Sequence, residues 1–405
     1  MGLFSDAFAA KSYSTYELFK EIYGGKPTKS GVAVNAKNAI DVSTVFACCR
    51  VIGEGVAQVP LQLMRESKDG KTRTKAKEHS LYDKLAFKPN RWMTSFEWRE
   101  LVCWHVVLCG NHYSFINRLG NKIVELYPFT PGSVEVTFDR GVLTYKVTAE
   151  DGTSRPFPAE LILHVRGPSM NGWYGLEAVK NAREAIGLAM ATESAAASLH
   201  QNGVNPSGVY SVEGTLSPDG YKNLSEWIAK HYAGAENAGK ALILDRAAKW
   251  SQTQMSGIDA QSVEQRRFQI EEICRFARVM PIMVGYSDKA ATYASAVQLF
   301  LAHVVHTLAP WYQRLEQCLD ANLLTDKERA AGYYFNFVEE GLLRGSVAET
   351  HAMILADVNG GLITPNHGLA LLDMNPDPDP ASDKLRIPTN IVGNQPQTTS
   401  PGTTK

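Results

Sequence analysis

The chain has 405 residues, of which 44% are hydrophobic and 20% are charged, and its formal net charge is −1. This composition indicates a folded protein of two or three domains and excludes a wholly disordered chain. The near-neutral charge also excludes a protein that coats DNA through a basic surface, because such binding depends on displacing counterions from many phosphates.

Neither the cysteines nor the apolar runs indicate a disulfide framework or a membrane segment. The six cysteines, at positions 48, 49, 103, 109, 274 and 318, include no CxxC pair. We expect buried, reduced thiols, because free cysteine is most often a small core residue. No apolar run approaches the roughly 18 residues of a membrane span, so no membrane partner is expected.

The first part of the chain predicts an arm followed by helix and strand. Residues 1–40 are mixed in character and are expected to form a flexible N-terminal arm. Apolar residues recur at helical spacing over 42–57, and an apolar strand follows over 59–64. Asp69-Gly70 is a tight-turn pair, so the strand is expected to continue into a hairpin.

A second long helix and a series of strands complete this region as an α+β domain. Thr94 or Ser95 can cap a helix that runs to about Cys109, where Gly110-Asn111 ends it. Over 112–166, apolar and polar residues alternate between turn pairs rich in glycine. This pattern predicts a single antiparallel meander.

Two long helical patterns follow, with a small separate unit between them. The alanine-rich stretch 176–201 predicts a helix, since alanine has the highest helix propensity. A second helix is predicted over 260–280, where Glu271 and Arg275 have the spacing of a helical ion pair. Between the two helices, residues 206–258 predict a β-α-β-β unit.

A short polar loop separates the second helix from a third, longer one. Met280-Pro281 ends the second helix, and the loop begins at Gly285. The third helix is predicted over 292–323 with a kink at Pro310, because proline removes a backbone donor and clashes with the preceding turn.

The remainder of the chain predicts one strand, two helices and a tail. The strand is expected at 333–337, and the helices over 346–359 and after Thr364. From about Asn375 the composition is rich in proline and polar residues, which predicts disorder.

This order of segments, together with six stretches of sequence, resembles the portal proteins of tailed bacteriophages of the HK97 type. Portals are ring-shaped DNA channels at one vertex of the capsid. The stretches that carry the resemblance are VFACCRVIGEGVAQVPLQLM (45–64), HSLYDKLAFKPNRWMTSFEWRE (79–100), GNHYSFINR (110–118), GLEAVKNAREAIGLAMATESAAASLHQNGVNPSGV (175–209), RRFQIEEICRFARVMPIMVG (266–285) and TPNHGLALLDMNP (364–376).

The resemblance implies a portal fold of the α+β class, divided into nine segments along the chain. They are a flexible arm (1–40), an α/β wing (41–170), a first stem helix (175–203), a small β-α-β-β clip (204–258), a second stem helix (259–281), a tunnel loop (282–292), a long kinked spine helix with a return to the wing (293–345), a short helical crown segment (346–375) and a disordered tail (376–405).

The resemblance also implies the function and the partners. We expect a ring of about twelve copies through which double-stranded DNA passes during packaging and ejection. The ring would contact the terminase large subunit, a head–tail adaptor protein and the major capsid protein or scaffold. It would be assembled in the bacterial host cytoplasm and remain in the virion. Neither catalytic residues, a cofactor nor a metal site is expected.

Three groups of residues are candidates for these contacts. The tunnel loop would face DNA through Gly285, Tyr286, Ser287, Asp288, Lys289 and Thr292. Contacts between neighbouring stems would involve Glu264, Arg267, Glu271, Arg275 and Arg278. The docking surface of the clip would include Lys222, Glu226, Lys230 and Glu236.

Two other functions are alternatives to a portal. Residues 234–241 (GAENAGKA) fall short of a phosphate-binding P-loop, because Ala241 stands where a metal-binding hydroxyl is needed and the flanking elements are in the wrong order. A nucleotide-binding enzyme is therefore the weaker alternative. A monomeric interaction module tethered by its polar tail is the other. His303 and His306 lie one helical turn apart, but without a carboxylate partner they favour hydrogen bonding over a metal site.

Overall fold

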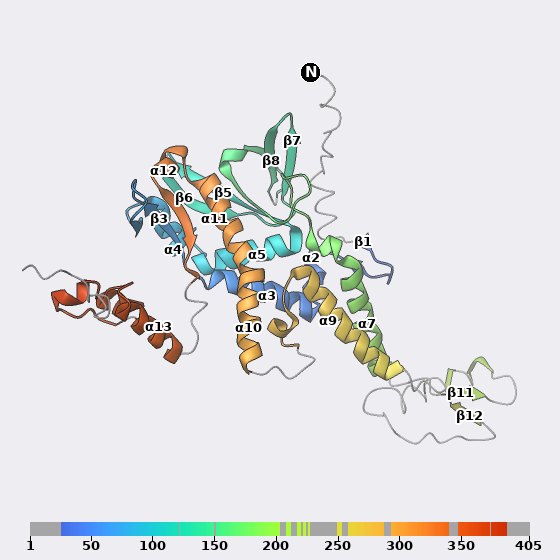
Figure 1. Ribbon diagram of the computed structural model, residues 1–405. Helices are drawn as coiled ribbons and strands as arrows, with labels where there is room; N and C mark the ends of the chain where they lie inside the picture. The colour runs from blue at the N-terminus through green and yellow to red at the C-terminus, as the bar shows by residue number, and fades with distance from the viewer. Residues whose placement is uncertain are drawn as a thin grey trace, which may run out of the picture. The chain divides into compact units, whose positions relative to one another are not determined.

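The computed structural model describes residues 26–120, 122–149, 151–202, 208–211, 217–219, 222–223, 226, 249–252, 258–286, 293–339, 347–372 and 374–386. The chain divides into two compact units, residues 1–338 and 339–405. Figure 1 shows the described elements of both.

The first unit mixes helices with short strands. Its α-helices are α2 (Ala36–Ala39), α3 (Ser43–Ala57), α4 (Ser80–Ala86), α5 (Ser95–Cys109), α6 (Ala178–Asn181), α7 (Arg183–Asn202), α9 (Ile258–Ala277), α10 (Tyr293–His303), α11 (Ala309–Leu323) and α12 (Asp326–Ala330). Its strands are β1 (Lys26–Pro27), β2 (Ala33–Val34), β3 (Leu61–Glu66), β4 (Arg73–Lys75), β5 (Asn111–Leu119), β6 (Lys122–Pro128), β7 (Val134–Asp139), β8 (Val142–Thr148), β9 (Ser154–Pro158), β10 (Ile162–Arg166), β11 (Gly208–Ser211), β12 (Lys249–Gln252) and β13 (Tyr333–Phe337). Shorter turns are η2 (Ala159–Leu161), η4 (Pro281–Val284) and the π-helical η5 (Val304–Leu308).

The prediction of a flexible arm over residues 1–40 is wrong for residues 26–40. Strands β1 and β2 pair as an antiparallel hairpin, and α2 follows. The hairpin packs on α7, where a Cβ on Gly187 would lie 2.6 Å from Thr28, and the Lys29 amide donates to Glu184 Oε2 at 3.0 Å. Contacts with a helix far along the chain therefore order this segment, which local composition could not indicate. Residues 1–25 lie outside the described part.

Helices α3 and α5 pack against each other and form the centre of the first unit (Figure 1). The helix predicted over 42–57 is α3, and its buried residues include Cys48, Cys49 and Ile52. The N-cap of α5 is Thr94, one of the two predicted residues, and its side chain accepts from the Glu97 amide as part of a capping box. All six cysteines of the chain are free and five are buried, so the prediction of buried thiols is confirmed for these five, whereas Cys318 is half-buried.

A buried arginine joins the ends of three helices. Arg99 Nη2 donates to Ala57 O at 2.7 Å, and Nη1 donates to Ser95 Oγ at 2.8 Å and to Leu85 O at 3.5 Å. These acceptors lie at the end of α3, the start of α5 and the end of α4. Burial lowers the pKa of Arg99 to about 10. A cation near carbonyls at helix C-termini is favourable, which offsets part of the cost of burial.

Replacing Arg99 with alanine should therefore destabilise the protein by about 2 kcal/mol, because Ala57 O would lose its Arg99 donor and Leu85 O would lose one of its two side-chain donors. Arg99→Lys should lose about half as much, since one ammonium cannot reach both carbonyls. Urea unfolding followed by tryptophan fluorescence measures both variants. If the two variants were equally stable, the forked hydrogen bonding would not be what stabilises these helix ends.

The predicted single meander over 112–166 is wrong, because the strands divide into two sheets. One three-stranded sheet has the order β10-β5-β6 and the other the order β7-β8-β9. Strand β10 returns to pair with β5, with His164 opposite Tyr113. Strand β9 was not predicted, because Pro156 and Pro158 hide its pattern, but proline is tolerated on an edge strand. A buried cluster that includes Tyr113, Val136 and Tyr145 packs the two sheets together.

A third sheet brings together segments from the two ends of the first unit. Its order is β13-β3-β4, with Phe337 opposite Leu61. The strand predicted at 333–337 and the hairpin predicted at Asp69-Gly70 are both confirmed. Helix α11 packs on β13 and supplies two carboxylates to it. Asp320 accepts from the Phe335 amide at 2.8 Å, and Glu316 accepts from the Phe337 amide at 2.7 Å.

The helix predicted over 292–323 is interrupted rather than simply kinked. The π-helical turn η5 separates α10 from α11, and Pro310 lies in the first turn of α11. Proline donates no amide hydrogen bond, so the preceding turn is free to widen. Leu308 of this turn packs on α3 at Gly55, where a Cβ would lie 2.8 Å away, and Tyr312 Oη donates to Gly55 O at 2.9 Å.

The helix predicted over 176–201 is also broken. It divides into α6 and α7 at Ala182, which leaves helical geometry. Val179 of α6 and Ile186 of α7 are both buried.

The second unit contains α13 (Val347–Asn359), α14 (Pro365–Leu371) and the turn η7 (Pro380–Asp383). Ile354 and Val358 of α13 are buried, and Thr364 caps α14 as predicted. The prediction of disorder from about Asn375 is wrong for residues 374–386. The Asn366 side chain donates to Asp377 O at 3.1 Å and to Asp383 Oδ1 at 2.7 Å, which ties this segment to α14. Residues 387–405 lie outside the described part.

Candidate functional site

Helices α7 and α9 lie side by side and extend from the body of the first unit (Figure 1). Many residues of α7 are alanine or glycine, which allows a second helix to approach closely. Gln269 Nε2 of α9 donates to Thr192 Oγ1 of α7 at 3.2 Å, and Gln269 is buried. The two helices predicted to flank the small unit are therefore in direct contact with each other.

The apolar stripe of α9 faces α3, as its spacing predicts. Ile273 and Cys274 are buried, and Cys274 Sγ lies 4.0 Å from Cys48 Sγ of α3. On other faces of α9, Glu264 and Arg267 are exposed while Glu271 is half-buried. The helix thus keeps one anchored face and leaves charges of both signs on the rest.

The ion pair predicted between Glu271 and Arg275 is wrong. Arg275 Nη1 instead lies 3.4 Å from Glu272 Oε1, at a spacing of three residues. Both spacings place side chains on one helix face, so sequence alone could not choose between two adjacent glutamates. The pair is exposed and contributes little to stability.

Helix α9 ends in a left-handed residue, Arg278, whose φ is 57°. The Val279 amide donates to Cys274 O at 3.0 Å, and the Arg278 carbonyl accepts from Thr307 Oγ1 of η5 at 2.8 Å. This second bond joins the end of α9 to the π-helical turn. The predicted break at Met280-Pro281 follows and is confirmed by η4.

The start of the candidate loop is held by this arrangement. Gly285 ends η4 with a φ of 81°, and the Tyr286 amide donates to Pro281 O at 3.1 Å. The chain is described again from Tyr293, where α10 begins. The other candidate loop residues, Ser287, Asp288, Lys289 and Thr292, lie outside the described residues.

Little of the predicted β-α-β-β unit belongs to the described part. Strands β11 and β12 pair antiparallel, with Tyr210 opposite Trp250. Lys222 and Glu226 are exposed, as a docking surface requires. Lys230 and Glu236 lie outside the described residues, as does the P-loop-like segment 234–241.

In the described part of the chain, no three His, Cys, Asp or Glu side chains are grouped as a metal site would need. Nor is any described helix both long enough and apolar enough to cross a membrane. The His303 ring was expected to make hydrogen bonds to another helix. Its buried Nδ1 has no hydrogen-bond partner among the described residues, so the expectation is wrong for that nitrogen.

Sequence reasoning missed the contacts that hold this region together. The left-handed Arg278, the Cys48–Cys274 contact and the Thr307 hydrogen bond all join segments far apart in the chain. Only the Met280-Pro281 break indicated that a sharp change of direction would occur here. No motif in the sequence marks the partners.

Two long helices in contact with each other, anchored on a mixed helical and strand body, agree with the order of segments that the portal resemblance implies. Residues 43–373 match the family model described as phage portal protein, and the chain belongs to that family. The expectation of a portal protein is therefore confirmed. Portal proteins form a ring at one vertex of the capsid, and this is the function of the chain.

Individual relatives agree with the family assignment. The chain is 28% identical to the probable portal protein of Streptomyces phage phiC31 over 408 residues, covering 97% of this chain and 88% of that protein. It is 25% identical to the portal protein of Enterobacteria phage HK97 over 336 residues, covering 82% and 79%.

Solved structures show the same fold. The crystal structure of an HK97 family phage portal protein from Corynebacterium diphtheriae aligns with a TM-score of 0.54 and 15% identity, over 76% of this chain and 96% of that one. A chain in the neck of a native gene transfer agent particle, computed with C12 symmetry, aligns with a TM-score of 0.54 and 21% identity, over 90% and 94%.

Proposed function

We propose that about twelve copies of this chain form the portal ring and that α7 and α9 are its stem helices. The observation that carries the proposal is the family match over residues 43–373, together with the place of the candidate loop in the chain between η4 and α10. The neck of the gene transfer agent particle, with its C12 symmetry, supports the number of copies. Residues 41–170 would form the wing, 204–258 the clip and 346–375 the crown segment.

The loop over 282–292 would face the DNA in the channel. Lys289 would contact phosphates, and Asp288 beside it would limit how strongly the loop holds them. A net charge of −1 for the whole chain supports a channel in which DNA slides, because each strong phosphate contact would add to binding and slow the movement.

The charged faces of α9 would contact the neighbouring stem. Glu264, Arg267, Glu271, Arg275 and Arg278 place both signs along one helix, so adjacent copies can pair opposite charges. Since Arg275 already pairs with Glu272 within the helix, its contact with a neighbour would require an exchange of partners.

The exposed Lys222 and Glu226 support the clip as the surface that meets the terminase large subunit and the head–tail adaptor. The major capsid protein or scaffold would contact the outer part of the ring. The ring would be assembled in the bacterial host cytoplasm and remain in the virion, as the matches to virion and neck particles support. The portal family is structural, so no catalytic activity is proposed.

The loop proposal predicts that Lys289→Glu, or deletion of 286–290, lowers the yield of packaged genomes by about tenfold while rings still form, because like charge repels the phosphates. Packaged DNA is measured by nuclease protection, and rings by negative-stain electron microscopy with light scattering. Lys122→Glu, an exposed change on β6, is the matched control and should package normally.

If the deletion variant packaged genomes at the normal yield, the proposed contact between the loop and DNA would be contradicted. Unmodified protein that remained monomeric at every concentration and failed to enter capsids would instead favour the interaction module and contradict the ring itself.

A further inference from the structure

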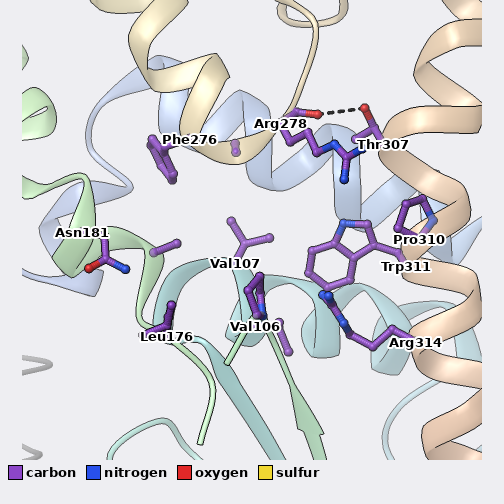
Figure 2. A pocket seen from close by; sticks show the side chains of 13 residues that line it. Val106, Val107, Leu176, Asn181, Phe276, Arg278, Thr307, Pro310, Trp311 and Arg314 are labelled. Atoms are coloured by element: carbon purple, nitrogen blue, oxygen red, sulfur yellow. Dashed lines mark hydrogen bonds between the residues drawn. The ribbon is translucent and has the colours of Figure 1, made fainter. Parts of the chain in front are cut away.

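A pocket of about 320 Å³ lies between α5, α6, α9, η5 and α11 of the first unit (Figure 2). Its walls are mostly apolar. They include Val106 and Val107 of α5, Leu176, Phe276 of α9 and Trp311 of α11. This volume is within the range of sites that bind small ligands or inserted side chains, roughly 300–1,000 Å³. Of the residues proposed for contacts within the ring, Arg278 alone lines this pocket.

Two arginines make the pocket positively charged. Figure 2 shows the side chains of Arg278 and Arg314 on opposite sides of the Trp311 indole. Arg314 Cζ lies 5.4 Å from the centre of the indole ring. Among the residues that the structure describes, no carboxylate lies within ion-pair distance of either arginine. Burial lowers the pKa of Arg314, which shows that its charge is partly removed from water. An anionic group entering the pocket would compensate this cost.

The backbone at Arg278 adds an independent observation. Its φ of 57° is a left-handed conformation that costs an ordinary L residue about 1–2 kcal/mol relative to glycine. Glycine is the common residue at such a helix end. An arginine here, with its side chain directed to Trp311, is consistent with a binding role for the guanidinium.

The pocket therefore suits apolar side chains that alternate with carboxylates. Residues 16–23 of this chain, Tyr-Glu-Leu-Phe-Lys-Glu-Ile-Tyr, have this composition, with Glu17 and Glu21 among five apolar or aromatic residues. The other end of the chain is a poor match, because residues 387–405 contain no acidic side chain.

The first described residues lie close enough for residues 16–23 to reach the pocket. The Lys29 amide donates to Glu184 Oε2, and Glu184 follows three residues after Asn181, which lines the pocket. The described chain begins at Lys26, and three to ten extended residues span roughly 10–35 Å. The segment can thus enter the pocket of its own copy.

We propose that residues 16–23 dock in this pocket of the same copy, with Phe19 against Trp311 and the two glutamates against Arg278 and Arg314. Docking would cover an apolar cavity and neutralise both guanidiniums. The inference concerns the subunit itself and does not depend on the ring.

Photo-crosslinking of the full chain tests the proposal. With Phe19 replaced by p-benzoylphenylalanine, we expect cross-links to the peptides that contain Phe276–Arg278 and Thr307–Arg314, read by mass spectrometry. The double variant Arg278→Glu/Arg314→Glu should lower their yield by about tenfold, because charge repulsion replaces attraction. Arg155→Glu, an exposed arginine on β9, is the control and should leave the yield unchanged.

Reversing the charges of the two glutamates as well distinguishes a loss of docking from a loss of folding. Adding Glu17→Arg/Glu21→Arg to the double variant should restore most of the yield, whereas a misfolded protein would not recover. Cross-links elsewhere in the chain, or an unchanged yield in the double variant, would overturn the proposal. Cross-links between isotopically labelled and unlabelled copies would overturn docking within one copy.

Discussion

Gly110→Ala is expected to destabilise the protein by about 3 kcal/mol or more. Gly110 ends α5 with a φ of 76°, which costs an alanine more than a glycine. An alanine Cβ would also lie 2.3 Å from the Leu176 carbonyl oxygen. That carbonyl cannot move easily, because the Leu176 amide donates to Pro168 O and the Gly175 amide donates to Asn111 Oδ1. Chemical denaturation in urea measures the loss.

Gly120→Ala is the matched control for this prediction. Gly120 also has a positive φ, 61°, but a Cβ there would meet nothing within 4 Å. Its loss should be only about 1 kcal/mol, from the backbone conformation alone. If the two variants lost equal free energy of unfolding, the close approach of Gly110 to Leu176 would not contribute to stability.

The second large effect is expected on mild acidification, through His105 of α5 and through His112 and His164, which are buried on opposite faces of the β10-β5-β6 sheet. His105 Nδ1 lies 3.0 Å from His112 Nδ1, and His112 Nε2 lies 2.8 Å from Ser114 Oγ. One proton can form the hydrogen bond in each of these two pairs of atoms. If His105 and His112 were both protonated, however, their charged rings would repel each other. On β10, His164 bonds to Tyr145 Oη at 3.1 Å and to Asn111 Oδ1 at 2.9 Å.

These surroundings favour the neutral rings. Burial lowers the pKa of His105 to about 4, and burial followed by the charge of His105 holds the pKa of His112 well below its usual range. Burial and, to a smaller extent, the positive charge of Arg166 also hold the pKa of His164 well below its usual range. In the unfolded chain each histidine titrates near 6.5. The unfolded state therefore takes up protons first as the pH falls.

Stability should accordingly be full above about pH 6.5 and fall as the pH drops from about 6.5 towards 4. His105, which is half-buried, contributes about 3 kcal/mol at most to this loss, given its pKa of about 4. His303, whose pKa is also lowered by burial, adds to it. Denaturation midpoints measured between pH 7.5 and 4 give the profile.

His105→Phe removes one titrating ring and keeps an aromatic side chain in its place. This variant should lose visibly less stability between pH 6.5 and 4 than the unchanged protein. His306→Gln, at an exposed position, should keep the original profile. A profile that is flat down to pH 4 in the unchanged protein would contradict the assignment of neutral, buried histidines.

Local signals in the sequence predicted most helix ends. Thr94 with Glu97, Gly110, Thr364 and the Met280-Pro281 break each act on the adjacent turn, so their effect can be inferred without the rest of the fold. The helical spacing over 42–57 likewise predicted which side of α3 is buried.

Contacts between distant segments could not be predicted in this way. The pairing of β10 with β5, the hairpin of residues 26–34 on α7 and the π-helical turn before Pro310 all depend on partners far along the chain. The sequence predicted the order of the segments that form the candidate site, and the family resemblance implied their roles. Its contacts, such as Thr307 with Arg278, follow from tertiary packing that no local pattern encodes.

The pairing of β13 with β3 has a consequence during synthesis of the chain. Leu61 leaves the ribosome early, but its partner Phe337 is made only near the end of the first unit. Until then β3 has one unpaired edge, and such an edge can pair with other chains. Closing so long a loop is slow, so this edge stays open until late in folding. A subunit truncated before Phe337 keeps the open edge, and only a chain translated through Phe337 completes the sheet.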